Sequence, residues 1–180
     1  MTFASTTFAP AARWLPRLLL GLGAALLVPA LHAQPHKEVL DRAAGYKDEA
    51  LQLLERLVNS DSGSANTAGL DKVRGVVVEE LQKLGAKIET FPATPHPGTN
   101  VVATFDGTGT RKILLMAHMD TVFADGVAKA KPFYTKDGRA YGPGVMDNKG
   151  GVVAGLYAIK ILKAMNFGGL RPHHLPARHQ

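Results

Sequence analysis

The sequence contains no cysteine, which excludes disulfide bonds, cysteine-type zinc fingers and thiol chemistry among its 180 residues. Acidic residues are also missing from both ends. Residues 1–37 carry three bases and no acid, and residues 148–180 carry five bases and no acid. Residues 38–147 carry 13 bases and all 15 acids, so the net charge of +6 comes from the ends. A nucleic-acid-binding protein gathers its bases on one folded face, so this distribution predicts no nucleic-acid partner.

The chain has no apolar run long enough to cross a membrane. Its longest run, Leu18–Leu31, has 14 residues where about 20 are needed. Arg13 and Arg17 precede the run and small or polar residues follow it, which is the pattern of a secretory signal peptide. We expect a signal peptide over residues 1–33, cleaved after Ala33 or three residues earlier. A retained anchor or a buried helix is the alternative. The mature protein is then periplasmic or secreted, without a membrane partner.

The rest of the chain alternates between helical and strand patterns, and its length fits one modest domain. Apolar residues at three- and four-residue steps predict helices, and short apolar or alternating runs predict strands. This interleaving predicts an α/β fold, with the nearly all-apolar run Ile113–Ala117 in the middle of a sheet. Asp137-Gly138 predicts a tight turn between strands. The predicted helices are Lys37–Asn59, Val73–Leu84 and the segment after Asp147, and the predicted strands are 86–91, 100–105 and 112–120.

Two residues with metal-binding chemistry follow the apolar strand. His118 and Asp120 are two positions apart, so in an extended chain their side chains point to the same side. They would lie at the carboxyl end of the strand, where open α/β sheets bind ligands. A carboxylate on one ring nitrogen orients a histidine whose other nitrogen binds zinc. A histidine at a strand end is more often a structural group, so this pair alone is a weak indication.

Asp147 stands in a glycine-rich segment, Tyr141–Gly151, just before the last predicted helix. The ordinary interpretation is a helix N-cap, where aspartate is favoured. The functional interpretation is a carboxylate that bridges two metal ions about 3.5–4 Å apart. The occurrence of this segment after the His118 segment, within one α/β pattern, favours the second interpretation.

Three segments carry a resemblance to a known family: LLMAHMDTVF (Leu114–Phe123), GRAYGPGVMDNKGGVVAGLYAIKIL (Gly138–Leu162) and LERLVNSDSGS (Leu54–Ser64). They resemble the co-catalytic zinc metallopeptidases. This family includes glutamate carboxypeptidases, aminoacylases, acetylornithine deacetylases and succinyl-diaminopimelate desuccinylases, and secreted glutamate carboxypeptidases are the most similar. The resemblance implies a three-layer α/β sandwich with a mixed, largely parallel central sheet, whose N-terminal part would be residues 34–165.

The resemblance also implies the roles of the site residues. His118 would be a ligand of one zinc ion and Asp147 would bridge two, while Asp120 would act in catalysis by orienting His118. The peptide bond after Asp147 would be cis. The implied substrate is a small peptide or acyl-amino acid whose C-terminal amide bond is hydrolysed, and the implied assembly is a homodimer.

The family's remaining active-site residues have no counterpart in this sequence. In the family a later strand supplies two glutamates, one the general base and one a zinc ligand, but no Glu follows Glu89 and no Asp follows Asp147 here. We likewise expect no counterpart of the family's second domain, which is used for dimerisation. We therefore expect the polypeptide as written to have little or no activity and an unpaired apolar strand edge.

Residues 166–180 do not resemble a folded segment, since they contain three histidines, two prolines and no acid. Replacement zinc ligands are one interpretation, but the spacing of His173, His174 and His179 matches no structural zinc pattern. A frameshifted or truncated gene product explains the segment better.

Two other function classes stay open at this stage. One is a non-catalytic secreted α/β scaffold or binding fragment. The other is a basic protein that binds anionic surfaces through its ends. This interpretation becomes weaker once signal cleavage removes the positive charges of Arg13 and Arg17.

Overall fold

The structure is a computed structural model, and the residues it describes all belong to one unit of the chain, His36–Gln180. The predicted signal peptide and nearly all of the predicted tail lie outside these residues, so both stay predictions. The described residues are 36–107, 110 and 112–167.

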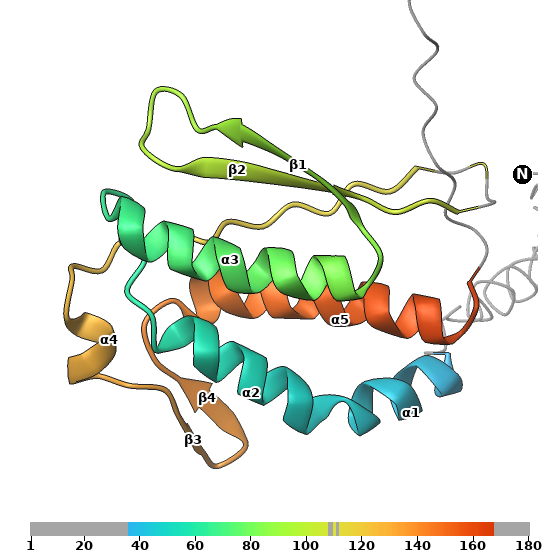
Figure 1. The fold of residues 1–180 in the computed structure, drawn as a ribbon. Helices are drawn as coiled ribbons and strands as arrows, with labels where there is room; N and C mark the ends of the chain where they lie inside the picture. The colour runs from blue at the N-terminus through green and yellow to red at the C-terminus, as the bar shows by residue number, and fades with distance from the viewer. Residues whose placement is uncertain (1–35, 108–109, 111, 168–180) are drawn as a thin grey trace, which may run out of the picture. The chain divides into compact units, whose positions relative to one another are not determined.

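Helices and short strands alternate along the described chain, which confirms a mixed α/β fold (Figure 1). The three long helices match the three segments that the apolar periodicity predicts. The elements are α1 (Lys37–Gly45), α2 (Lys47–Val58), α3 (Thr67–Lys83), β1 (Lys87–Pro92), β2 (Thr99–Thr104), α4 (Val127–Ala130), β3 (Tyr134–Lys136), β4 (Arg139–Tyr141) and α5 (Gly150–Ala164).

The core lies between α2, α3 and α5. The predicted stripe of α3 is confirmed, because Val73, Val77 and Leu81 are all buried. Leu57 and Val58 at the end of α2 are 0% exposed, so this end of the helix is held most firmly. The buried apolar cluster consists of Leu53, Leu54, Leu57, Val58, Val73, Val77, Leu81, Val152, Val153 and Leu156.

The first predicted helix is divided in two. α1 ends at Gly45, and Tyr46 has φ −93° and ψ 1°, outside the helical range. Glycine is among the poorest helix formers, which favours a break at this point. The Tyr46 ring lies 6.0 Å from the ring of Tyr157 in α5, so the break lets α1 and α2 both follow that helix.

Two antiparallel hairpins account for the strands. β1 pairs with β2 from Lys87 opposite Thr104 to Pro92 opposite Thr99, and the pair packs on α3. β3 pairs with β4 through the predicted turn. Asp137 and Gly138 have φ values of 50° and 72°, as a type I′ turn requires, so this prediction is confirmed.

The strand prediction for residues 112–120 is wrong. This segment runs extended in Figure 1 but belongs to no strand, and its apolar side chains lie open, with Leu114 81% and Met116 85% exposed. A central strand needs a partner on each edge, and in the described part of the chain none pairs with it. The expected parallel central sheet is likewise not seen there. The described parallel pairing is a single bridge between Gly63 and Thr121.

Helix length and apolarity also bear on membrane insertion. Within residues 36–107, 110 and 112–167, no helix is both long and apolar enough to span a bilayer.

Candidate metal centre

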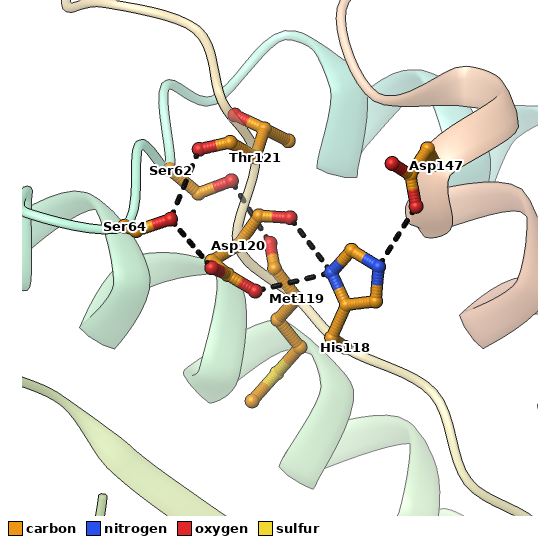
Figure 2. A network of polar contacts seen from close by, with 7 residues as sticks. All are labelled: Ser62, Ser64, His118, Met119, Asp120, Thr121 and Asp147. Atoms are coloured by element: carbon orange, nitrogen blue, oxygen red, sulfur yellow. Dashed lines mark hydrogen bonds and ion pairs between the residues drawn. The ribbon is translucent and has the colours of Figure 1, made fainter. Parts of the chain in front are cut away.

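His118 lies between two carboxylates, as Figure 2 shows. Its Nδ1 is 3.0 Å from Asp120 Oδ1 and 3.1 Å from the Asp120 carbonyl oxygen. Its Nε2 is 2.8 Å from Asp147 Oδ1. The structure therefore brings together the three residues that the sequence singled out, although they come from positions 29 residues apart. Their roles as ligands and in catalysis stay predictions.

A short segment after α2 holds the chain on both sides of Asp120. The Ser62 hydroxyl donates to the Met119 carbonyl oxygen at 3.0 Å, and the Thr121 amide donates to the Ser62 carbonyl oxygen at 2.8 Å. Both Ser62 and Thr121 are buried. The backbone around His118 is thus fixed by hydrogen bonds from one neighbouring segment, although its own apolar residues find no sheet partner among those described.

Ser64 extends this contact to the carboxylate itself. Its hydroxyl donates to Asp120 Oδ2 at 2.6 Å, while Asp120 Oδ1 faces the His118 ring (Figure 2). The two oxygens of Asp120 are therefore both engaged. A carboxylate held in this way fixes the orientation of the imidazole and keeps a proton on Nδ1, which leaves Nε2 free to act as a ligand.

Asp147 lies in an irregular turn, Val145–Lys149, that precedes α5. Its φ and ψ are −133° and 91°, outside the helical range, and the Asp147–Asn148 peptide bond is cis, as the resemblance implied. The residue before α5 is Lys149, and no side-chain cap hydrogen bond is present there. The N-cap interpretation of Asp147 is therefore wrong, and its carboxylate faces His118 instead.

Gly144 lets this turn approach the His118 side of the site closely. Its φ is +79°, and a Cβ placed on it would lie 2.7 Å from Thr121 Cγ2 and 3.3 Å from Lys149 Cδ. Only glycine adopts this conformation at this distance without strain. The turn therefore rests directly on Thr121, next to Asp120.

The hydrogen bonds around the imidazole change its pKa and that of Asp120. Burial works against the charged ring, but the hydrogen bonds with Asp147 and Asp120 outweigh it and raise the pKa of His118. The Ser64 hydroxyl and then the His118 ring lower the pKa of Asp120 in spite of its partial burial. In the absence of a metal ion, both ring nitrogens can carry a proton and donate to the flanking carboxylates. A cation on Nε2 replaces one of these protons.

The two donor groups, the imidazole of His118 and the carboxylate of Asp147, suit a divalent transition metal. An imidazole nitrogen and a carboxylate oxygen are zinc ligands, and the second carboxylate stands behind the ring where an orienting group is expected. Within the described residues, however, no group of three or more His, Cys, Asp or Glu converges as a complete metal site. The described chain supplies two converging donor atoms, one each from His118 and Asp147.

Three further residues of the site escaped the sequence interpretation. Ser62 and Ser64 stand in a segment rich in turn-forming residues, where a serine is ordinary. Lys149 is 1% exposed and its Nζ donates to the Ser60 carbonyl oxygen at 2.8 Å. Burial lowers the pKa of Lys149 to about 8, while the Asp61 carboxylate works in the opposite direction. A lysine beside two glycines gives no indication of burial in the sequence.

Comparison with known proteins agrees with the site geometry. The family model "Peptidase family M20/M25/M40" matches residues 114–174, a range that includes His118, Asp120 and Asp147. Over this range the chain is similar to this family. The resemblance to co-catalytic metallopeptidases is thereby confirmed at the level of the family.

Curated relatives include a carboxypeptidase and a deacetylase. Carboxypeptidase G2 of Pseudomonas sp. (strain RS-16) is 35% identical over 144 residues, which are 79% of this chain and 35% of that protein. Acetylornithine deacetylase of Proteus mirabilis (strain HI4320) is 35% identical over 108 residues, which are 56% of this chain and 28% of that protein. The chain thus spans about a third of the length of these relatives.

A solved structure shares the fold over most of the chain. Human carnosine dipeptidase 1 aligns with a TM-score of 0.62 and 23% sequence identity, covering 72% of this chain and 31% of that one. At this identity the match shows a common fold over the aligned part.

Asp61 provides a test of how the loop before β3 is attached. Its carboxylate accepts hydrogen bonds from the amides of Gly126 and Ala128 at 2.8 and 2.9 Å, and these bonds, the one from Ala128 first, lower its pKa. Asp61→Asn is expected to reduce the free energy of unfolding near pH 7 by about 1 kcal/mol, the usual net contribution of one hydrogen bond, because the amide keeps only one of the two acceptor oxygens.

The sign of the pH effect follows from the lowered pKa. The stabilisation is present above the unfolded pKa of about 3.9 and is lost as the pH falls through the folded value. Urea unfolding should show a constant difference between wild type and Asp61→Asn from about pH 5 to 7, shrinking below about pH 4. The exposed Glu89→Gln is the control, and a difference that grew on acidification would contradict this account.

Proposed function

We propose that this chain contains part of the metal centre of a zinc-dependent amide hydrolase. The observation that carries the proposal is the position of His118, whose ring contacts Asp120 on one side and Asp147 on the other, within the range matched by the family model. The similarity to a carboxypeptidase and to a deacetylase supports hydrolysis of an amide bond. We propose that the described elements are part of a three-layer α/β sandwich.

Each of the three residues has a distinct task in this proposal. His118 would hold a zinc ion through Nε2, and Asp147 would supply a carboxylate to it and to a second ion. Asp120 is a positioning residue that holds the ring through Nδ1 and is itself held by Ser64. The chemistry that zinc would supply at these residues is activation of a water molecule and polarisation of the substrate carbonyl.

The substrate class follows from the relatives and from the sequence resemblance. We propose a small peptide or acyl-amino acid, cleaved at its C-terminal amide bond, with a glutamate-type residue as the first candidate. The similarity to carboxypeptidase G2 supports this choice.

Zinc binding tests the metal centre directly. The full chain carries three histidines in its last residues, so His173, His174 and His179 are first replaced by glutamine to remove competing ligands. Calorimetric titration of this background with Zn²⁺ should show binding, and His118→Ala should abolish it because an imidazole ligand is lost. His96→Ala, in the exposed loop between β1 and β2, is the matched control. Equal losses in the two variants, or no binding at all, would refute the metal centre.

Hydrolysis tests the reaction class. The sequence has no glutamate after Glu89 to act as general base, and removal of a general base costs on the order of 10²–10⁴ in rate. The zinc-loaded chain should therefore release glutamate from a small acyl-glutamate at least about 10²-fold more slowly than Pseudomonas carboxypeptidase G2 does. Comparable turnover would show that this chain supplies its own general base.

Export is a separate proposal. We infer that residues 1–33 direct the chain out of the cytoplasm, on the strength of Arg13, Arg17 and the 14-residue apolar run. The protein recovered from the periplasm of an expressing bacterium should begin at Gln34. Recovery of an intact N-terminus in the membrane fraction would indicate an anchor instead.

A further inference from the structure

Lys149 occupies a position that is unusual for a lysine. It is 1% exposed and is the largest of the fully buried side chains in the described part of the protein. Lysine is almost never fully buried unless its ammonium is paired, because removal of the charge from water is costly. Its Nζ donates to the backbone carbonyl oxygen of Ser60 at 2.8 Å. This single long side chain therefore connects the Asp147 turn to the segment that follows α2.

The same segment, Ser60–Ser64, holds the other half of the site. Ser62 binds the backbone at Met119 and Thr121, and Ser64 binds the carboxylate of Asp120. Five consecutive residues thus contact the chain beside His118 and the chain beside Asp147. We refer to Ser60–Ser64 as the clamp segment.

The two donor side chains have little else to fix their separation. The Asp147 side chain is 78% exposed and the His118 side chain 48% exposed, so packing around them is sparse. Their relative position must come from the backbone that carries them. That backbone is tied to the clamp segment at Lys149 on one side and at Ser62 and Ser64 on the other.

We propose that Lys149 and Ser64 are positioning residues which, through the clamp segment, set the distance between His118 Nε2 and Asp147 Oδ1. Lys149 anchors the turn that carries Asp147, and Ser64 anchors the carboxylate that orients His118. Neither side chain touches the space between the two donor atoms. This inference rests on the proposed function for its connection to zinc, but the geometry it concerns exists without the metal.

The test uses the full chain with the three tail histidines replaced, as above. Lys149→Met keeps the aliphatic stem and removes the ammonium, and Ser64→Ala removes an exposed hydroxyl. Lys160→Met is the matched control, because Lys160 is also paired, but its partner, Glu49, lies outside the clamp segment. Zinc affinity is measured by competition with a chromophoric chelator. The ring nitrogens of His118 are followed by NMR in the metal-free protein.

Both substitutions should lower zinc affinity by about 10–100-fold, as is usual for groups that orient a ligand, while the control leaves it unchanged. The ring ¹⁵N shifts of His118 should move in Lys149→Met and Ser64→Ala and stay in place in Lys160→Met. A purely structural role would lower the unfolding midpoint without moving these signals. Unaltered ring shifts and zinc affinity in folded Lys149→Met and Ser64→Ala would overturn the proposal.

Two complications leave the test decisive. Should Lys149→Met fail to fold, Ser64→Ala decides the matter alone, since its hydroxyl is exposed and contributes little to the core. Should the parent chain bind no zinc, the proposed function fails, and the ring shifts in the metal-free protein still decide whether the clamp segment positions His118.

Discussion

The packing of the end of α2 against the beginning of α5 is the constraint on which the site depends. Leu57 and Val58 are fully buried there and belong to the same buried cluster as Val152 and Val153, so the chain leaves α2 and enters α5 at one place. The segments that carry the chemistry are attached to this point by hydrogen bonds and by the packing of Met119 and Val145 against the core. A half-exposed site can therefore keep a defined geometry because its attachments lead into the buried core of the described chain.

Much of this arrangement could be predicted from local pattern. The stripe through Val73 and Val77 specifies α3, and Asp137-Gly138 specifies a hairpin, because both depend on neighbours close in sequence. The meeting of His118 with Asp147 depends on tertiary structure, and the resemblance to a family predicted it where spacing alone favoured structural interpretations. Lys149 and Ser64 could not be predicted, because burial and partners more than 50 residues away leave no local pattern.

The segment Ile113–Ala117 shows where pattern reasoning fails. Its run of apolar residues is typical of a strand buried on both faces, yet a strand exists only through hydrogen bonds to neighbours. β1 pairs with β2 and β3 pairs with β4, and none of these described strands pairs with the segment. The apolar composition thus predicted that the segment suits a buried position in a sheet. Whether such a position exists depends on partner strands formed by other residues.

The openness of His118 and Asp147 bears on which ion such a site would select. One imidazole and one carboxylate, both accessible to water, impose neither a fixed coordination number nor a rigid cavity. Affinity then follows the intrinsic order of the divalent ions, in which copper and nickel surpass cobalt and iron. Metal identity at these residues would consequently reflect the supply of ions in the surrounding compartment, and discrimination among them would have to come from ligands contributed by other parts of the protein.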